Sequence, residues 1–434
     1  MRKKRIILAQ FVSVVSSVAL VACASSTTGS TSAKAASGSP ILVGNITSIA
    51  SPIFDFQPLV DGLNAAIQAV NKRGGIAGRP LKLIQCDDKA DPNLDVSCAR
   101  EMVNDHVVAT LADNSPGNPV AVDQILGQAG ISRILFAPTV PADFACTNVC
   151  FPAGTGNLGI VSAMGAVAAQ QVAKKITLLY PDIPEGAQIT GFIGQIITAN
   201  GGQMVNKIPV GGTVTDYTSL VEAAQQNGAG AAILALGTST ADSVLAAAQQ
   251  INSPLKFIAS TGNFSISDFQ QFPKVAPSIV MADHTPAPTA SASTYPGLGE
   301  FRADMAASGN KNLAVNKLTT QPLAGWLAVH AFYQVMKDTD PKNITAATVL
   351  AAFSSAKNVD MRGIFLPWTP ANNTDNPLLK RAWPYYYISR YRNGTIDTQP
   401  TEPFDLLAAL TGSFKFVSSA SPTMSSTSST SSTS

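Results

Sequence analysis

Short apolar runs of strand length alternate along most of this chain with segments of helical period. In residues 59–71, for example, Leu63, Ile67 and Val70 fall on one face of a helix, and an apolar run follows at 81–85. Alternation of this kind is typical of a parallel sheet covered on both faces. We therefore expect an α/β fold. The expected strands of a first series are 41–46, 81–85, 107–111 and 134–136, and its expected helices are 59–71, 93–104 and 120–130.

A second series of the same kind begins near Leu158. Its expected helices are 158–173, 185–200, 217–227 and 240–250, and its expected strands are 176–180, 203–210, 231–236 and 256–259. Residues 151–154 separate the two series, and residues 284–288 follow the second; both segments contain the proline that suits connections between bodies. Two α/β bodies are implied. Helices at 295–308, 321–337 and 346–356 and a strand around 385–388 complete the chain.

Residues 69–92 join a helix end, a strand and an acidic loop in one run. Gly74 and Gly75 suit a helix C-terminus, and Asp91-Pro92 suits the start of the next helix. The run reads N-x-x-GG-I-x-G, then a strand, then x-DD-x-x-x-P. This sequence pattern closely resembles the first lobe of bacterial branched-chain amino acid binding proteins, the receptors of ABC importers. The resemblance covers Ile41 to about Phe416.

The resemblance implies the type I periplasmic binding protein fold, in which two doubly wound parallel-sheet lobes are joined by a three-segment hinge. Lobe 1 would comprise residues 40–152 and 284–364, and lobe 2 residues 153–283 and 365–416. It also implies a monomeric receptor without a cofactor. That receptor would close on a small polar organic ligand, a branched-chain amino acid or an amide or carboxylate relative, and deliver it to ABC permease subunits in the membrane. A ligand sensor of the same fold that feeds a signalling receptor is the alternative.

The N-terminus reads as a targeting signal. Residues 2–5 are Arg-Lys-Lys-Arg, residues 6–22 are largely apolar, and residues 20–23 read Leu-Val-Ala-Cys. This resembles a lipobox, so residues 1–23 are interpreted as a lipoprotein signal with Cys23 as the lipidated residue; an ordinary cleaved signal with a chance cysteine is the alternative. Ser, Thr and Ala dominate residues 24–39 and 417–434, interpreted as a flexible linker and a disordered tail. We expect an extracytoplasmic protein with a lipid anchor.

Charge and cysteine content narrow the function further. Charged residues make up 13% of the chain and the net charge is +2, so no basic footprint for nucleic acid exists. Besides Cys23 the chain has four cysteines, and an even number in an exported protein favours disulfides. Three pairings are possible, and pairing neighbours predicts Cys86–Cys98 and Cys146–Cys150. A metal site is the rival interpretation, but the three histidines are scattered.

Ligands of open parallel sheets bind beyond the carboxyl ends of the strands. Small polar residues occupy those positions here: Asn114 and Ser115, for instance, precede an expected helix N-terminus and suit a carboxylate. Each such loop could instead be a plain capping turn. The loops selected by this rule are 47–57, 113–118, 137–143, 181–186, 237–240 and 260–264.

The family resemblance selects the same loops. It implies that Ser115 and Thr139 hold the ligand's carboxylate and that Phe54 covers its side chain. A family acid that meets the ligand's ammonium should fall near Thr261, and threonine cannot neutralise a buried ammonium. An α-amino acid ligand would therefore need Asp182 or Glu185 instead. The full set of candidate ligand-binding residues is Phe54, Asn114, Ser115, Thr139, Asp182, Glu185, Thr238, Thr261 and Asn263.

One rival motif points to an enzyme. Residues 154–159 match the dinucleotide fingerprint G-x-G-x-x-G, and Asp182 lies beyond a later strand. The preceding residues, however, include Pro152 and Cys150, which suit a disulfide-bonded turn better than a buried strand. We therefore expect no catalytic function. An exported dinucleotide-dependent α/β enzyme is the less favoured alternative.

Overall fold

The computed structural model describes residues 35–49, 51, 54–152, 154–372 and 381–413. The predicted signal with Cys23, most of the predicted linker and the 417–434 tail lie outside the described residues. Among the described helices, none has both the length and the apolar character that crossing a membrane requires.

The first sheet contains five parallel strands in the order β2-β1-β3-β4-β5. The expected β4 segment is shifted toward the N-terminus, because Leu135 adopts a left-handed backbone (φ 52°) and ends the strand at Ile134. The strands are β1 (Ile41–Thr47), β2 (Leu81–Asp87), β3 (Ala109–Leu111), β4 (Ser132–Ile134) and β5 (Cys150–Phe151).

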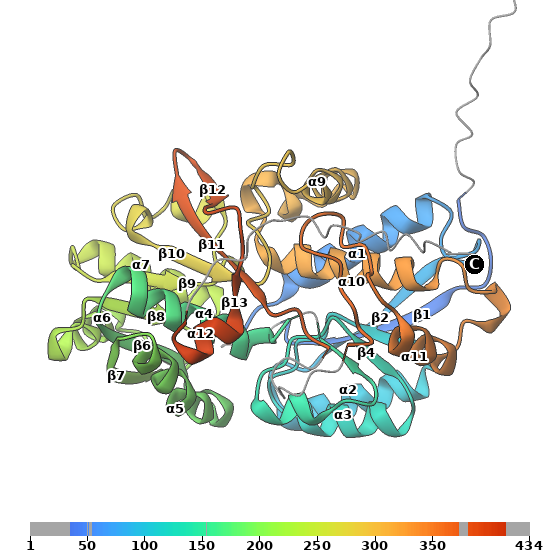
Figure 1. Ribbon diagram of the computed structural model, residues 1–434, viewed down its shortest axis with the longest axis horizontal. Coiled ribbons are helices and arrows are strands. Elements are labelled where there is room, and N and C mark those ends of the chain that lie inside the picture. Colours follow the sequence, from blue (N-terminus) through green and yellow to red (C-terminus); the bar gives the residue numbers. More distant parts are fainter. Residues whose placement is uncertain (1–34, 50, 52–53, 153, 373–380, 414–434) are drawn as a thin grey trace, which may run out of the picture. The chain divides into compact units, whose positions relative to one another are not determined.

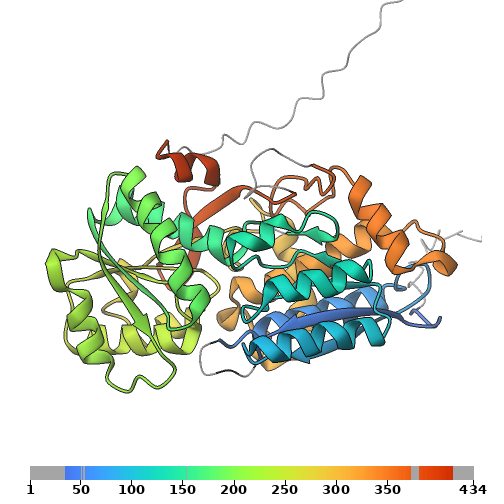
Figure 2. The ribbon, with the colours of Figure 1, turned by 90° about the horizontal axis from the view of Figure 1, so that it is seen from below.

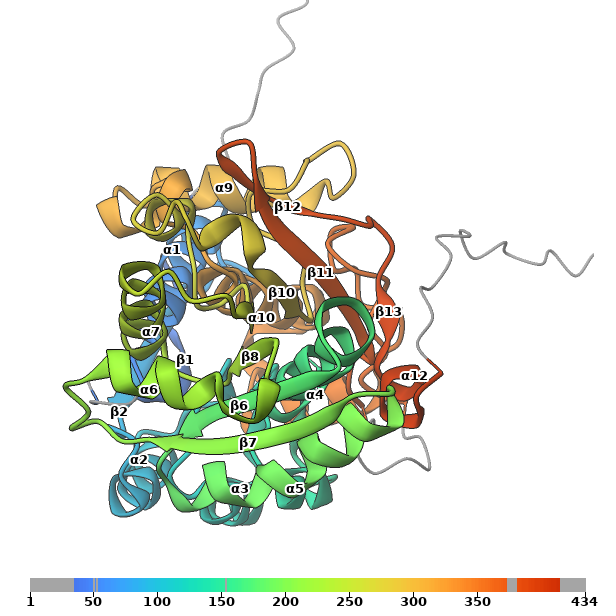
Figure 3. The same cartoon turned by 90° about the vertical axis from the view of Figure 1, so that its left-hand side faces the viewer.

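The second sheet has the order β12-β11-β10-β9-β8-β6-β7, with β13 paired to β11. Strands β6 to β10 are parallel to one another, whereas β11 pairs antiparallel with β10, β12 and β13. Figure 3 shows β7 alongside β6 with α5 close to it, and β11 beside β10. The strands are β6 (Lys175–Pro181), β7 (Gln203–Val210), β8 (Ala231–Leu234), β9 (Lys256–Ala259), β10 (Val280–Asp283), β11 (Tyr385–Arg392), β12 (Thr395–Thr398) and β13 (Phe404–Asp405).

Helices flank the strands of both sheets, as Figure 2 shows, and the α/β prediction is confirmed. A π-helical segment, Ala168–Val172, extends α4. The α-helices are α1 (Gln57–Lys72), α2 (Pro92–Asn104), α3 (Pro119–Gln128), α4 (Gly156–Val167), α5 (Pro184–Ala199), α6 (Tyr217–Ala224), α7 (Thr238–Gln250), α8 (Ile266–Phe269), α9 (Gly297–Ala307), α10 (Thr320–Met336), α11 (Ala346–Ser355) and α12 (Leu406–Thr411).

The residues within 69–92 that were predicted to end one helix and to begin the next do so. Gly74 and Gly75 have φ values of 107° and 66°, a left-handed conformation that glycine adopts without steric cost, and α1 ends just before them. The Asp91 carboxylate accepts hydrogen bonds from the Asn93 and Leu94 N–H groups at the start of α2. Both predicted disulfides, Cys86–Cys98 and Cys146–Cys150, are present.

The helices that follow β10 pack against the first sheet. Helices α9 and α10 contact α1, and α11 contacts β4. Figure 1 shows α10 beside α1. Two glycines permit this close crossing: a Cβ on Gly62 of α1 would lie 2.3 Å from the Pro322 carbonyl oxygen, and a Cβ on Gly325 of α10 would lie 2.5 Å from the Leu59 carbonyl oxygen.

Strand β10 is the main element that the apolar pattern did not predict. Its apolar run, residues 279–282, is short and directly follows Pro277 and Ser278, so it does not stand out among the neighbouring loops. The strand nevertheless lies inside the second sheet, between β9 and β11, and it ends at the buried Asp283.

The close packing of α1 against α10 at Gly62 and Gly325 predicts how a methyl group added there changes the free energy of unfolding. Gly325→Ala should lower the free energy of unfolding by about 1–3 kcal/mol, because the added methyl group must push α10 away from α1. Gly191→Ala on α5 is the matched control, since no atom lies within 4 Å of its Cβ position. That change should raise stability by about 0.5–1 kcal/mol through helix propensity. Urea denaturation of the two variants measures both effects, and equal stability would contradict a tight crossing.

Candidate ligand-binding site

A pocket of about 200 Å³ lies at the carboxyl ends of the strands of both sheets. This is the edge that the strand-end rule selects. Its polar lining comes from loops and first helical turns: Asp55, Asp113, Asn114, Thr139, Asn157, Thr238, Ser260, Asn263, Asp283, His284, Thr320 and Gln321. The pocket therefore joins residues that are far apart along the chain.

Most of the pocket wall is apolar. Phe54 and Phe56, in the segment before α1, stack with their ring centroids 5.6 Å apart and an interplanar angle of 13°. The other large apolar residues of the lining are Leu59, Leu135, Phe136, Leu158, Ile160, Val161, Met164, Ile183, Ile189, Leu234, Leu236, Leu327 and Phe365. Such a wall suits an apolar ligand body better than a wholly polar ligand.

Asn114 and Asn157 connect the two sides of the pocket. The Asn157 Nδ2 group, at the start of α4, donates a hydrogen bond to Asn114 Oδ1, which follows β3, over 3.2 Å. Asn114 is positioned by its own backbone N–H, which donates to Thr47 Oγ1 and to the Ile46 carbonyl. These bonds fix the backbone of Asn114, and the bond from Asn157 holds its side chain.

The N-terminus of α4 lacks a side-chain cap. The hydroxyl of its N-cap residue, Thr155, is hydrogen-bonded to the Tyr386 hydroxyl at 2.6 Å instead. Gly156, Asn157 and Leu158 form the first turn of α4 and line the pocket. Because the first N–H groups of a helix have no partner within the helix, this turn offers donors and a positive dipole end to an anion.

A buried cluster around Arg133 supports the lobe 1 side of the pocket. Arg133 is 1% exposed, and its guanidinium pairs with Asp113 Oδ2 at 3.2 Å and with Asp123. Burial lowers the pKa of Arg133, but the charges of Asp123 and Asp113 outweigh that effect and raise it overall. The same guanidinium lies 4.3 Å from the centroid of the Phe136 ring, which lines the pocket.

Asp283 organises the opposite side. Its Oδ2 accepts hydrogen bonds from Ser260 Oγ (2.7 Å), Thr261 Oγ1 (3.0 Å) and Thr320 Oγ1 (2.9 Å). Its Oδ1 accepts from the His284 backbone N–H and lies 2.8 Å from His284 Nδ1. Burial raises the pKa of Asp283, yet the hydrogen bonds and charge of His284 and the hydroxyl donors outweigh it and lower the pKa. Asp283 is therefore a carboxylate with its oxygens already engaged.

Five of the nine predicted ligand-binding residues line the pocket: Phe54, Asn114, Thr139, Thr238 and Asn263. Thr139 also donates from its hydroxyl and its backbone N–H to the buried Asp143. The Asn263 amide donates to the Leu236 carbonyl at 2.7 Å.

Three of the other four predicted residues, Ser115, Asp182 and Thr261, are outside the pocket lining. Ser115 is buried with its hydroxyl 3.4 Å from Arg133 Nη2, and Thr261 is buried behind the pocket as a donor to Asp283. Asp182 is exposed, and the side chain of Glu185 lies outside the described residues.

Sequence reasoning missed Asn157, Asp283 and Gln321, and it selected the loop of Ser260 without choosing that residue. For Asp283 a signal existed, because an apolar run that ends in Asp-His repeats the strand-end pattern used for the other loops. Asn157 carried no such signal, since it belongs to a helix that connects one sheet to the other. That connection also removes the context of the dinucleotide fingerprint: β5 and β6, on either side of α4, belong to different sheets.

Two buried carboxyl groups hold loops that follow strands of the first sheet. Asp88 accepts from the Ser48 hydroxyl, in the loop after β1, and Asp95 accepts from the Asn118 backbone N–H, in the loop after β3. Both residues are fully buried. Burial, followed by the charge of Asp88, raises the pKa of Asp95 to about 8. At neutral pH Asp95 is thus mainly protonated.

Comparisons with known proteins agree with this architecture. The family model described as periplasmic binding protein matches residues 40–391. The Leu/Ile/Val-binding protein BraC3 of Rhizobium johnstonii is 28% identical over 102 residues, which is 23% of this chain and 28% of that relative. The chain thus matches less than a third of the length of this curated relative.

Two solved structures are similar in fold. One is the solute binding protein of an ABC transporter from R. palustris in complex with 4-hydroxybenzoate, with a TM-score of 0.67 and 17% identity over 84% of this chain and 97% of that one. The other is the fatty acid ABC transporter substrate-binding protein from Thermomonospora curvata, with a TM-score of 0.69 and 18% identity over 86% of this chain and 94% of that one. At these identities the likeness shows the fold.

The Asp95 carboxyl predicts a pH effect on stability. Its folded pKa of about 8 lies above the ordinary value of 3.8, so its protonated form contributes stability that is present at low pH and lost as pH rises through about 8. Asp95→Asn should remove that loss. Between about pH 5 and pH 9 the variant should gain about 1.4 kcal/mol or more relative to the original protein. Urea denaturation at both pH values measures it.

The exposed Asp105, at the end of the same helix, offers the control. Asp105→Asn should leave the pH dependence unchanged. A parallel pH profile for Asp95→Asn and the original protein would show that Asp95 holds no extra proton in the folded state.

Proposed function

Because this chain belongs to the periplasmic binding protein family, we propose that it is the solute-binding receptor of an ABC importer and that its ligand is a small, largely apolar carboxylate. The observation that supports this ligand class most directly is the pocket itself, whose apolar walls surround an uncapped helix N-terminus. No step of this function needs catalysis. The ligand is captured and handed over unchanged.

The carboxylate is proposed to bind between Asn114, Thr139 and the first turn of α4. To donate to it, the Thr139 hydroxyl turns away from Asp143 Oδ2, which keeps the backbone N–H groups of Thr139 and Val140 as donors. Asn114 Oδ1 accepts from Asn157, so the amide's N–H groups are directed away from Asn157 and can donate to a ligand oxygen. The N–H groups of the α4 first turn add donors from the other side. Arg133 supplies positive charge behind this end, although the acids paired with it offset that charge. Ser115 acts here as a supporting residue, through its contact with Arg133.

The buried acids of the pocket do not suit the ammonium of an α-amino acid. Asp113 already accepts from the Ile46 N–H, the Thr110 hydroxyl and Arg133. Asp283 is engaged by three hydroxyls and His284. An ammonium placed beside either acid would have to break these bonds, and a buried unpaired charge is costly. A carboxylate without an α-ammonium, of the kind named for the two structural neighbours, meets no such conflict.

Hinge closure is the proposed mechanism of capture. The pocket is lined by residues of both sheets, so a ligand contacts both lobes only when they are together. The ligand then stabilises that arrangement by its differential affinity. The Asn157–Asn114 bond and the bond from Thr320 on α10 to Asp283 on β10 are among the direct protein contacts that would form or break with it.

The ligand class can be tested by thermal shift with benzoates, branched short-chain acids, fatty acids and branched-chain amino acids. At a concentration of ~100 times its dissociation constant a ligand should stabilise the protein by about 2.7 kcal/mol. For the acid that binds, Thr139→Val should weaken affinity by roughly tenfold or more, because a hydrogen bond to a charged group contributes about 1.5–3 kcal/mol. Calorimetric titration measures the loss.

Thr198→Val is the matched control, because Thr198 is exposed on α5 and outside the pocket lining. It should bind as the original protein does. Undiminished affinity in Thr139→Val would place the carboxylate elsewhere in the pocket, whereas binding of amino acids alone would reject the proposed ligand class.

Membrane attachment through Cys23 is the second part of the proposal, supported by the Leu-Val-Ala-Cys sequence at 20–23. Cys23→Ser should abolish incorporation of a radiolabelled fatty acid and leave the precursor uncleaved. The following residue, Ala24, has no thiol that could take over the attachment. Normal labelling of Cys23→Ser would reject the lipid anchor, and the proposed ligand would be unaffected by that outcome.

A further inference from the structure

Gln321 places an unpaired acceptor in the pocket wall. It lies on the first turn of α10, and its Nε2 donates to the Gly262 carbonyl at 3.1 Å. Its Oε1 is buried and has no hydrogen-bond partner among the described residues. The amide cannot be reversed without cost, because its oxygen would then face the oxygen of Gly262. The atom that remains for a ligand is therefore an acceptor.

Asp283 makes the neighbouring hydroxyl groups acceptors as well. Ser260 and Thr320 both line the pocket, and both donate their hydroxyl protons to Asp283 Oδ2. A hydroxyl whose proton is already donated offers only lone pairs. This end of the pocket, comprising Ser260, Thr320 and Gln321, is called the acceptor end below. Its character depends on the buried charge of Asp283.

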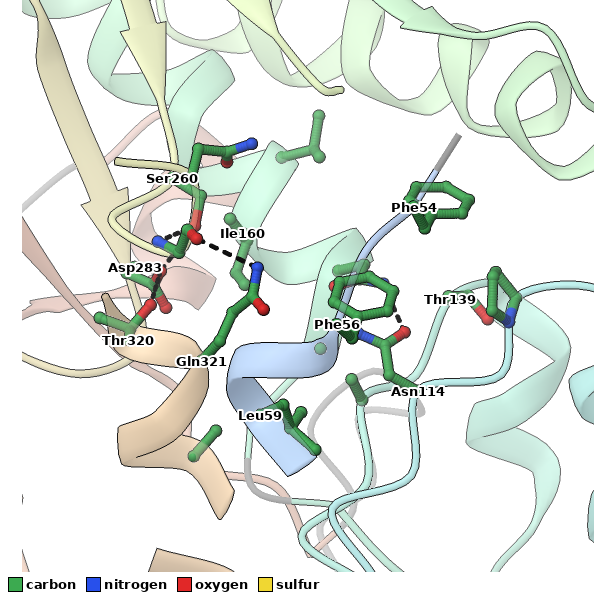
Figure 4. A pocket seen from close by; sticks show the side chains of 18 of the residues that line it. Phe54, Phe56, Leu59, Asn114, Thr139, Ile160, Ser260, Asp283, Thr320 and Gln321 are labelled. Carbon is green, nitrogen blue, oxygen red and sulfur yellow. Dashed lines mark hydrogen bonds between the residues drawn. The ribbon is translucent and has the colours of Figure 1, made fainter. Parts of the chain in front are cut away.

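The acceptor end is separated from the proposed carboxylate site. Figure 4 shows Ser260, Thr320 and Gln321 on one side and Asn114 and Thr139 on the other. In the same view, the apolar residues Phe56 and Leu59 lie between the two polar ends, and Ile160 is a further apolar residue of the lining. A ligand that satisfies both ends needs two polar groups with an apolar frame between them.

We propose that Gln321 is a specificity-determining residue that selects ligands with a hydrogen-bond donor at the end remote from the carboxylate. The ligand class is thereby narrowed to hydroxy- or amino-substituted acids whose donor and carboxylate are separated by an aromatic ring or an aliphatic chain. An α-amino acid does not fit, because its two polar groups share one carbon atom. This inference rests on the proposed function, since it takes the carboxylate position from it.

The energetic reason is the asymmetry of buried polar groups. An acid without the remote donor leaves Oε1 of Gln321 dehydrated and unpaired, and an acid with a hydroxyl there pairs it. The difference should appear as a preference of roughly tenfold or more for the hydroxylated member of a matched pair. Sites that bind a polar group in this way reject the analogue that lacks it.

The test uses two matched pairs of probes, 4-hydroxybenzoate against benzoate and 6-hydroxyhexanoate against hexanoate, titrated by calorimetry. The original protein should prefer the hydroxylated member of at least one pair by about tenfold or more. Gln321→Met, of similar length and without an acceptor amide, should bind both members of that pair with nearly equal affinity. Its affinity for the unsubstituted acid should stay within a few-fold of the original.

Gln334→Met is the matched control, the same change on the same helix at a residue outside the pocket lining. Gln334→Met should keep the full preference for the hydroxylated acid of the pair. The thermal midpoint of each variant without probe establishes that it is folded, and Gln321→Leu serves as a second variant if Gln321→Met does not fold.

Three outcomes overturn the inference. Equal binding of both members of each pair by the original protein, or a preference that persists in Gln321→Met, overturns it while the proposed carboxylate ligand stands. Binding of none of the four acids overturns the carboxylate proposal and this inference together.

Discussion

A buried aspartate at the end of an internal strand holds the candidate site together. Asp283 ends β10, and its carboxylate gathers hydroxyl donors from the loop after β9 and from the first turn of α10. Taking a carboxylate out of water is costly unless several donors compensate it, so each of these donors is held in one orientation. The hydrogen bond from Thr320 ties a helix packed on the first sheet to a strand of the second. The geometry of the acceptor end follows from this single charge.

Similar use of buried acids recurs on the other side of the pocket. Asp113 anchors the Ile46 N–H and Arg133, and Asp143 accepts from the backbone of Thr139. Asp88 and Asp95 attach the loops that follow β1 and β3. In each case the carboxyl group accepts at least one hydrogen bond that orients a strand-end loop. Acids near the pocket are therefore structural, and they are poor indicators of a cationic ligand group.

Because the buried acids are structural, the presence of Thr261 where an acid is expected bears on the kind of ligand. Thr261 does not take the place of a ligand-binding carboxylate. It donates to Asp283, a structural carboxylate on the neighbouring strand. The pocket retains negative charge, but the carboxylate oxygens of Asp113 and Asp283 are engaged by groups of the protein itself. What reaches the ligand is a set of lone pairs at one end, helix N–H groups at the other, and aromatic and aliphatic side chains between them. The arrangement favours an elongated acid with two separated polar groups.

The order of strands and helices was determined by the sequence alone. Apolar periodicity, the glycines at 74 and 75 and the Asp91 cap act within a few residues of one another, so a local pattern is enough to place the elements they bound. The strand-end rule likewise placed the pocket's loops, and nearest-neighbour pairing gave both disulfides. The short strand β10 was not predicted, because a run of four apolar residues beside a proline carries little periodicity.

Only the tertiary structure decided which side chains of those loops face the pocket. Ser115 contacts Arg133, which lies 18 positions away, and Thr261 donates to Asp283, 22 positions away. Asn157 reaches Asn114 across 43 positions, because its helix passes from one sheet to the other. A polar side chain points toward its best buried partner, and that partner is brought near only by the folded chain. Local patterns therefore located the loops, whereas long-range hydrogen bonding selected the residues within them.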